Sequence, residues 1–319
     1  MVVLLSACGG VAPAPTGSQA TPSGTVRLYT SVVQETVDAV VKPFQAAHPG
    51  LTVEVFRAPS GQLDARIAAE QRQGGIQADV LWETDPLSMQ QFAGQHLLRQ
   101  WTPSEQSAVP AGYRGNGFWG TRILNMVIIH RADLASAPVD WGDLLNPAYK
   151  GAVAIPDPGF AGSAYGALAY LGMSPDFGID FYRKLKANGA VQVSAIGDAI
   201  TGVAEGRFKV GMSLDVTTRQ QIAKGSPIKI VWPKSGAIAI YSPIAEIAAS
   251  QNRTAAESFI DFVLSKPGQE AIAATGWQPI RAGVTGGPTP GGKQVEPDWS
   301  AAFRRQTDLL REYRTVFGA

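Results

Sequence analysis

The sequence predicts an α/β protein of two lobes, because helix-like and strand-like segments alternate along most of its length. The alternation begins strand, helix, strand, helix, strand, which favours a parallel sheet with right-handed crossovers. The pattern restarts after about residue 122, so we expect a second sheet. A ligand cleft is expected at the strand C-termini of the two lobes. Apolar residues make up 45% of the 319, enough for one large core or two smaller ones.

The elements of the first lobe follow from apolar periodicity. An apolar stripe at Val37, Val40, Val41 and Phe44 predicts a helix, in which Pro43 predicts a kink or an early end. Gly74 and Gly75 stop the next helix, which begins near Ser60. The expected elements are strands at 26–30, 51–58 and 78–83, helices at 34–47, 60–73 and 86–98, and a long apolar strand at 122–130.

The second lobe continues in the same alternation. It opens on a loop, a short helix and a strand within 140–158, and it closes on an amphipathic helix at 299–317. Between them we expect helices at 162–171, 177–189, 197–206 and 217–225, strands at 190–194, 208–214, 227–233 and 237–248, and late helices within 254–275.

The N-terminal residues predict a lipid anchor. Leu5-Ser6-Ala7-Cys8 matches the lipobox of bacterial lipoproteins, in which the signal is cut before the cysteine and the thiol is acylated. Cys8 is the one cysteine, so no internal disulfide is expected. The uncharged stretch 9–24 has one large apolar residue and predicts a tether. We therefore expect a signal remnant at 1–7, an acylated Cys8 with tether at 8–24, and a body held on the extracytoplasmic face of the membrane.

Composition excludes two further classes. The formal net charge is +1 and no basic run occurs, which argues against nucleic acid as a partner. After the N-terminal stretch, no run reaches the roughly 18 apolar residues that span a bilayer, which argues against a transmembrane helix in the body.

Six stretches of the body carry a family resemblance, and they read LYTSVVQETVDAVVKPFQAAHPGLTVEVFRAPSGQL, GGIQADVLWETDP, DLLNPAYKGAVAIPDPGFAGSAYG, VAEGRFKVGMSLD, KIVWPKSG and AESFIDFVLSKPGQEA. Through them the chain resembles the extracellular solute-binding proteins of ABC importers, in the branch of ferric-iron, phosphonate and sugar-phosphate binders. The resemblance spans Val26 to Arg281 and implies a type II periplasmic-binding fold that closes on ligand about a hinge. It implies lobe 1 at 25–121 plus 241–282, lobe 2 at 122–240 plus 283–319, and a permease as partner.

The stretch DPGFAGSAYG predicts an anion site. A helix beginning near Gly162 leaves free N–H groups, small residues let an anion approach them, and the Ser163 hydroxyl adds a donor. The matching stretch of the family binds an anion, whereas the alternative is that Ser163 only caps the helix. With the other strand-end loops, the candidate ligand-binding residues are Thr30, Ser31, Ser60, Gly61, Glu83, Thr84, Gly162, Ser163, Ala164, Ser194, Asp215 and Thr217.

Two carboxylates indicate that the ligand carries a positive group as well as an anionic one. Glu83 and Asp215 could hold an ammonium group opposite the anion, which fits a zwitterion such as 2-aminoethylphosphonate. The alternative for each is that it caps the following helix. Trp82 is interpreted as core rather than as a stacking wall. Arg122 could pair with a ligand oxygen, but we interpret it as a surface arginine beside the hinge.

Ferric iron is the rival ligand. The ferric branch holds its metal mainly with two adjacent tyrosines, which align here to Val216 and Thr217, and its first-loop histidine falls near Val33. Glu83 and Asp215 remain, with three tyrosines in the neighbourhood, so the usual donor set of hard anionic oxygens is missing. We therefore expect no metal site and no cofactor. The three nearby tyrosines are Tyr29, Tyr165 and Tyr241.

Other classes of function are weakly supported. An envelope hydrolase would need a catalytic centre, but His48, His96 and His130 lie in no H-E-x-x-H pattern, and no Gly-x-Ser-x-Gly elbow is present. An adhesion or scaffold lipoprotein would not need a donor-rich cleft. The sequence therefore predicts a monomeric, non-enzymatic lipoprotein that captures a small anionic or zwitterionic solute for an ABC permease, with ferric iron as the alternative cargo.

Overall fold

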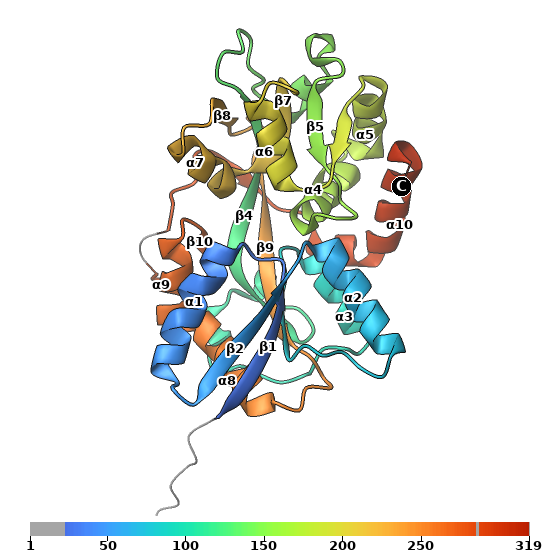
Figure 1. Ribbon diagram of the computed structural model, residues 1–319. Helices are drawn as coiled ribbons and strands as arrows, with labels where there is room; N and C mark the ends of the chain where they lie inside the picture. The colour runs from blue at the N-terminus through green and yellow to red at the C-terminus, as the bar shows by residue number, and fades with distance from the viewer. Residues whose placement is uncertain (1–22, 285–286, 319) are drawn as a thin grey trace, which may run out of the picture.

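The computed structural model describes residues 23–284 and 287–318 (Figure 1). The predicted signal remnant, the lipidation at Cys8 and nearly all of the tether lie outside the described residues. Gly24, the last residue of the expected tether, already begins the first strand. Within the described ranges, no helix combines the length and the apolar character needed to cross a bilayer.

The first lobe is built on three parallel strands. Strand β1 (Gly24–Thr30) lies between β2 (Leu51–Arg57) and β3 (Val80–Trp82). Helices α2 (Ser60–Arg72) and α3 (Pro86–Gly94) lie to one side of the strands, and α1 (Gln34–Ala47) lies to the other (Figure 1). The order strand, helix, strand, helix, strand is the one that the periodicity predicts.

Helix α1 spans the expected residues 34–47, so of the two effects expected of Pro43 the early end does not occur. It continues to Ala47, and the chain leaves it at His48. Phe44, the residue after the proline, is fully buried with its ring 5.1 Å from that of Phe259. Burying a phenylalanine stabilises by about 1.5–3 kcal/mol, which offsets the hydrogen bond that proline cannot donate.

Two long antiparallel strands run through both lobes. They are β4 (Phe118–Arg131) and β9 (Ala237–Glu246), and Figure 1 shows them passing from one lobe into the other. The two predicted lobe boundaries, 121/122 and 240/241, fall inside these strands. The strands therefore connect the two sheets into one path, β2-β1-β3-β9-β4-β7-β5-β6.

A β-bulge interrupts the pairing of β4 with β9. Gly120 pairs with Pro243 and Arg122 with Ser242, so Thr121 is the extra residue. The Thr121 hydroxyl donates to the Ser242 carbonyl at 2.8 Å. Because strand side chains alternate between faces, one inserted residue decides the face on which Arg122 lies.

The second lobe repeats the pattern of the first. Its central strands β5, β6 and β7 are parallel, and β8 joins the sheet through β4. Its elements are β5 (Val153–Pro156), α4 (Gly162–Met173), α5 (Gly178–Ala187), β6 (Val191–Val193), α6 (Ile196–Ala204), β7 (Val210–Leu214), α7 (Asp215–Ala223) and β8 (Ile228–Val231). Short 3-10 turns cover 106–108 and 111–113 before β4, and 141–145 and 147–149 in the second lobe.

The C-terminal region returns to both lobes. Helices α8 (Arg253–Leu264) and α9 (Lys266–Ala274) cover the first sheet, and α10 (Trp299–Phe317) lies beside α4 and α5 (Figure 1). The remaining strands are β10 (Gln278–Pro279) on β4 and β11 (Gln294–Val295) on β9.

Gln269 on α9 has a structural role. The Gln269 side chain is fully buried, and its Oε1 accepts from the backbone N–H groups of Ile280 at 3.0 Å and Arg281 at 3.2 Å. Its Nε2 donates to the Val263 carbonyl at 2.9 Å. Gln269 thus fixes the segment that follows Trp277. The Trp277 side chain itself lines the cavity between the lobes.

Candidate functional site

A cavity of about 400 Å³ lies between the lobes, and we call it the cleft cavity. Loops after β1 and β3 and the start of α2 line it from the first lobe. The starts of α4 and α6 and the end of β7 line it from the second. Six of the predicted residues are in its wall, namely Ser31, Ser60, Thr84, Gly162, Ser163 and Thr217.

Helix α4 points an uncapped N-terminus into the cleft cavity. Ala161 is the N-cap residue and makes no side-chain cap hydrogen bond. Ser163 is the second residue of the helix, is 3% exposed and lines the cavity. The alternative that Ser163 serves only as the helix cap is therefore wrong, because Ala161 occupies that position. Free backbone N–H groups and a hydroxyl donor face the same space.

Arg122 supplies a positive charge to the cleft cavity. The residue is fully buried, and its Nε and Nη1 atoms have no hydrogen-bond partner within the described residues. Its guanidinium carbon lies 4.3 Å from the ring centroid of Trp277, which also lines the cavity. Burial lowers the pKa of Arg122 to about 9, so the group still carries its charge at neutral pH.

The interpretation of Arg122 as a surface residue is wrong. The available signal was its place at the start of the long, largely apolar strand expected at 122–130, because such a strand is buried and a charge on it needs a reason. Trp277 was missed because nothing local distinguishes it from the other tryptophans. Arg57, also missed, lines the cavity and donates from its Nε to the Val32 carbonyl at 2.8 Å.

Glu83 lies behind the hydroxyls of the cavity wall. Its Oε2 accepts from Ser31 Oγ at 2.7 Å and from Ser60 Oγ at 3.0 Å. The Glu83 side chain is fully buried and is not part of the cavity lining. Burial, and then the nearby Asp64 carboxyl, raise the pKa of Glu83 well above its usual range. Glu83 therefore does not contact the cavity itself, but it bonds two serines that do.

Asp215 also stays outside the cavity lining, although its neighbour Thr217 is part of it. Asp215 is the first residue of α7, is 1% exposed, and has one oxygen 3.5 Å from Arg219. Its Oδ1 has no partner within the described residues. Whether Asp215 contacts ligand stays a prediction.

The remaining predicted residues have other surroundings. Thr30 Oγ1 donates to the Trp82 carbonyl at 2.6 Å, and Trp82 is buried in the core as expected. Ala195 rather than Ser194 lines the cleft cavity, and Ala164 is buried outside its lining. Thr30, Ala164 and Ser194 are therefore not among the residues that line the cleft cavity, and their contact with ligand stays a prediction.

The two lobes touch beside the cleft cavity. The Gly61 N–H donates to the Phe160 carbonyl at 3.2 Å across the lobes. A Cβ placed on Gly162 would lie 2.3 Å from Asp85 Oδ2 and 2.7 Å from Ser60 Oγ. Only a glycine at position 162 permits this approach, so the start of α4 rests directly on the first lobe.

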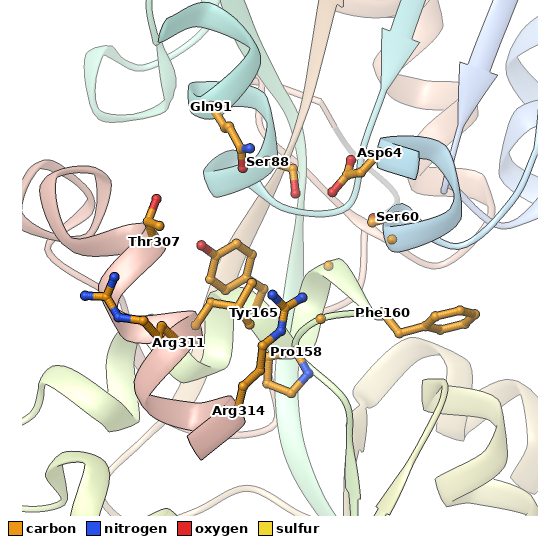
Figure 2. A pocket seen from close by; sticks show the side chains of 14 residues that line it. Ser60, Asp64, Ser88, Gln91, Pro158, Phe160, Tyr165, Thr307, Arg311 and Arg314 are labelled. Carbon is orange, nitrogen blue, oxygen red and sulfur yellow. The ribbon is translucent and has the colours of Figure 1, made fainter. Parts of the chain in front are cut away.

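A second cavity of about 480 Å³ lies beyond this contact (Figure 2). It shares Ser60 and Gly162 with the cleft cavity. Figure 2 shows Asp64 on one side of it and Tyr165 and Arg314 on the other. Burial, followed by the charge of Asp85, raises the pKa of Asp64 to about 7. Both cavities are lined by arginines, and the second one differs from the cleft cavity in that a carboxyl, Asp64, is part of its wall.

The lining of the cleft cavity is poor in metal ligands. The lining contains no Asp, Glu, His, Cys or Tyr. It does contain two arginines, Arg57 and Arg122. The three nearby tyrosines lie elsewhere: Tyr29 bonds Glu70, Tyr165 bonds the Gln306 carbonyl, and Tyr241 packs on Trp299. The described part of the chain contains no group of three His, Cys, Asp or Glu side chains that could hold a metal ion.

Comparisons with known proteins agree with this architecture. The family described as bacterial extracellular solute-binding protein matches residues 26–278. A putative 2-aminoethylphosphonate-binding periplasmic protein of Salmonella typhimurium is 28% identical over 247 residues, which are 74% of this chain and 72% of that protein. Iron uptake protein A1 of Synechocystis is 25% identical over 302 residues, 88% of this chain and 82% of that protein.

Solved structures share the fold. The periplasmic binding protein AfuA from Actinobacillus pleuropneumoniae, with exogenous fructose-6-phosphate bound, has a TM-score of 0.81 at 21% identity and covers 93% of this chain and 100% of its own. Iron-bound HitA from Pseudomonas aeruginosa has a TM-score of 0.78 at 22% identity, with 93% and 100% covered. The predicted two-lobed type II periplasmic-binding fold is thereby confirmed.

Proposed function

The chain belongs to the bacterial extracellular solute-binding protein family, and from this premise we propose that it captures a small phosphonate or phosphate ester in the cleft cavity. Proteins of this family bind solutes for ABC importers and pass them to a permease. We propose that this protein does so without chemical change to the solute, as a monomer. We also propose that Cys8 anchors it to the extracytoplasmic face of a membrane.

The single observation that carries the proposal is the unpartnered guanidinium of Arg122. A buried arginine without an acceptor is costly, so the group needs an anion that enters the cavity. Phosphonate and phosphate oxygens match the fork geometry of a guanidinium, and such charge-assisted bonds are about twice as strong as neutral ones. The uncapped start of α4 and the Ser163 hydroxyl add donors to the same cavity.

A zwitterion is the solute we favour within this class. The relative from Salmonella typhimurium carries 2-aminoethylphosphonate in its name, and the cavity of about 400 Å³ has room for so small a molecule. We propose that Asp215 accepts from the ammonium group, because its buried Oδ1 has no partner and it lies close in sequence to Thr217 in the wall.

Ferric iron remains the second candidate because relatives carry iron in their names. The arginines and the missing tyrosine pair disfavour it, since a cation site wants anionic oxygens. A direct titration separates the candidates.

The test is calorimetric titration of the whole chain after unfolding and refolding, which strips bound solute. The titrants are 2-aminoethylphosphonate, inorganic phosphate, fructose 6-phosphate and ferric citrate. We expect binding in the micromolar range or tighter, about −8 kcal/mol or more favourable, for one of the first three. Binding of ferric citrate alone would overturn the proposal.

Replacing Ser163 with alanine is expected to weaken binding of the identified anion about tenfold, because a hydrogen bond to a charged group contributes about 1.5–3 kcal/mol. Titration calorimetry measures the change. Ser258→Ala is the matched control, since that exposed hydroxyl bonds only the Thr254 carbonyl on α8. Equal affinity of both variants would remove Ser163 from the site.

A further inference from the structure

The hydroxyls of Ser31 and Ser60 lie between the cleft cavity and the buried carboxyl of Glu83. Each lines the cleft cavity, and each also lies within hydrogen-bond distance of Glu83 Oε2, at 2.7 Å and 3.0 Å. A hydroxyl has one proton to donate. A hydroxyl that donates to Glu83 therefore presents only oxygen lone pairs to the cavity, which repel an anion.

The protonation state of Glu83 decides the direction of these bonds. An ionised carboxylate only accepts, so it takes the protons of both serines. A protonated carboxyl donates its own proton to one serine and frees that hydroxyl to donate elsewhere. The freed proton goes either into the cavity or to Thr84 Oγ1, which lies 3.1 Å from Ser31 Oγ and 3.3 Å from Ser60 Oγ. Because Thr84 lines the same cavity, its own hydroxyl is then free to donate there. The neutral form also removes a negative charge from directly behind the anion site.

The surroundings of Glu83 favour the neutral form. From the first lobe, Ser31 after β1 and Ser60 and Asp64 on α2 surround it, and Thr84 and Asp85 follow it in the chain. Ser242 on β9 donates to the backbone carbonyl of Glu83. The start of α4 packs against Asp85. The only charged groups among them are the two other carboxyls. Oε1 of Glu83 has no partner within the described residues.

We propose that Glu83 is a positioning residue that, in its neutral form, turns the Ser31 or Ser60 hydroxyl toward the anionic solute and so makes capture weaken as the carboxyl ionises. The inference rests on the proposed function of the cleft cavity. It assigns Glu83 to the anionic end of the solute rather than to an ammonium group.

The sign of the pH dependence follows from the raised pKa of Glu83. Below that pKa the carboxyl is neutral and the cavity offers its full set of donors. As pH rises through it, affinity is expected to fall by up to about tenfold per pH unit if only the neutral form binds. Asp64 raises the pKa of Glu83, so Asp64→Asn is expected to move the fall to lower pH.

The experiment compares wild type with Glu83→Gln by calorimetry from about pH 5 to about pH 9. The titrants are 2-aminoethylphosphonate and methylphosphonate, which lacks the ammonium group. The ratio of the two proteins' dissociation constants cancels the ionisation of the titrant. We expect a ratio near one in acid and a steady rise in favour of Glu83→Gln toward alkaline pH, with both titrants. In a Ser31→Ala, Ser60→Ala background the rise is expected to shrink, because both hydroxyls that bond Glu83 Oε2 are then missing.

Two outcomes would overturn the inference. One is a ratio independent of pH. The other is a loss of 2-aminoethylphosphonate binding by Glu83→Gln with methylphosphonate binding kept, which would make Glu83 an ammonium acceptor. Infrared difference spectra of solute-free wild type and Glu83→Gln provide an independent measurement, and we expect a protonated-carboxyl band at neutral pH. Should wild type bind no phosphonate or phosphate, the proposed function fails, while this band still decides the state of Glu83.

Discussion

Replacing Arg122 with methionine is expected to weaken solute binding by at least about 2 kcal/mol, or about thirtyfold. Truncating one partner of a buried, hydrogen-bonded charge pair costs about 2–5 kcal/mol, and Arg122 is the fully buried cation of the cleft cavity. Arg122→Lys is expected to lose part of this, because lysine keeps the charge without the planar fork. Calorimetric titration of the three proteins with the identified solute measures both losses.

The same substitution separates binding from folding. Arg122 has two unpartnered buried nitrogens, so methionine of similar length is not expected to lower the free energy of unfolding of the solute-free protein. Its stabilising contact with the Trp277 ring contributes about 2 kcal/mol, and the cost of burying the unpartnered charge offsets it. Arg183→Met is the matched control on the surface, where the side chain is paired with Asp180. Unchanged affinity in Arg122→Met would refute the anion site.

Replacing Gly162 with alanine is expected to weaken solute binding about tenfold or more by holding the lobes apart. The added Cβ would lie 2.3 Å from Asp85 Oδ2 and 2.8 Å from Thr84 Oγ1, closer than real contacts allow. Either the lobes separate or Asp85 turns away and loses its cap bond to the Ser88 N–H, which contributes about 1 kcal/mol. Affinity and small-angle X-ray scattering with and without solute measure the effect.

Gly94→Ala is the control for this variant. Gly94 ends helix α3, and a Cβ there meets nothing within 4 Å. Its affinity and scattering are expected to match wild type. If Gly162→Ala also matches wild type in both measurements, the contact between α4 and the first lobe plays no part in closure.

The sequence by itself determined the features that depend on near neighbours. The apolar stripe at Val37, Val40 and Phe44 is the buried face of α1. The glycine-rich stretch before Ser163 does begin a helix, at Gly162. Periodicity and turn chemistry act over a few residues, so one sequence suffices to find them. At Pro43 the early end expected from local chemistry does not occur, because the distant residues Phe259 and Phe262 pack on Phe44, the next residue of the helix.

The sequence predicted six residues of the cleft cavity from the loops at strand ends, and the tertiary structure decided the others. Arg122 enters it because the bulge at Thr121 shifts the register of β4 against β9, whose partner residues lie more than a hundred positions later. Trp277 reaches it through a segment that Gln269 holds, and Glu83 is kept behind Ser31 and Ser60 by the packing of β1 and α2. Strand register, and hence the face of each side chain, depends on pairing between distant segments, which no local pattern in a single sequence specifies.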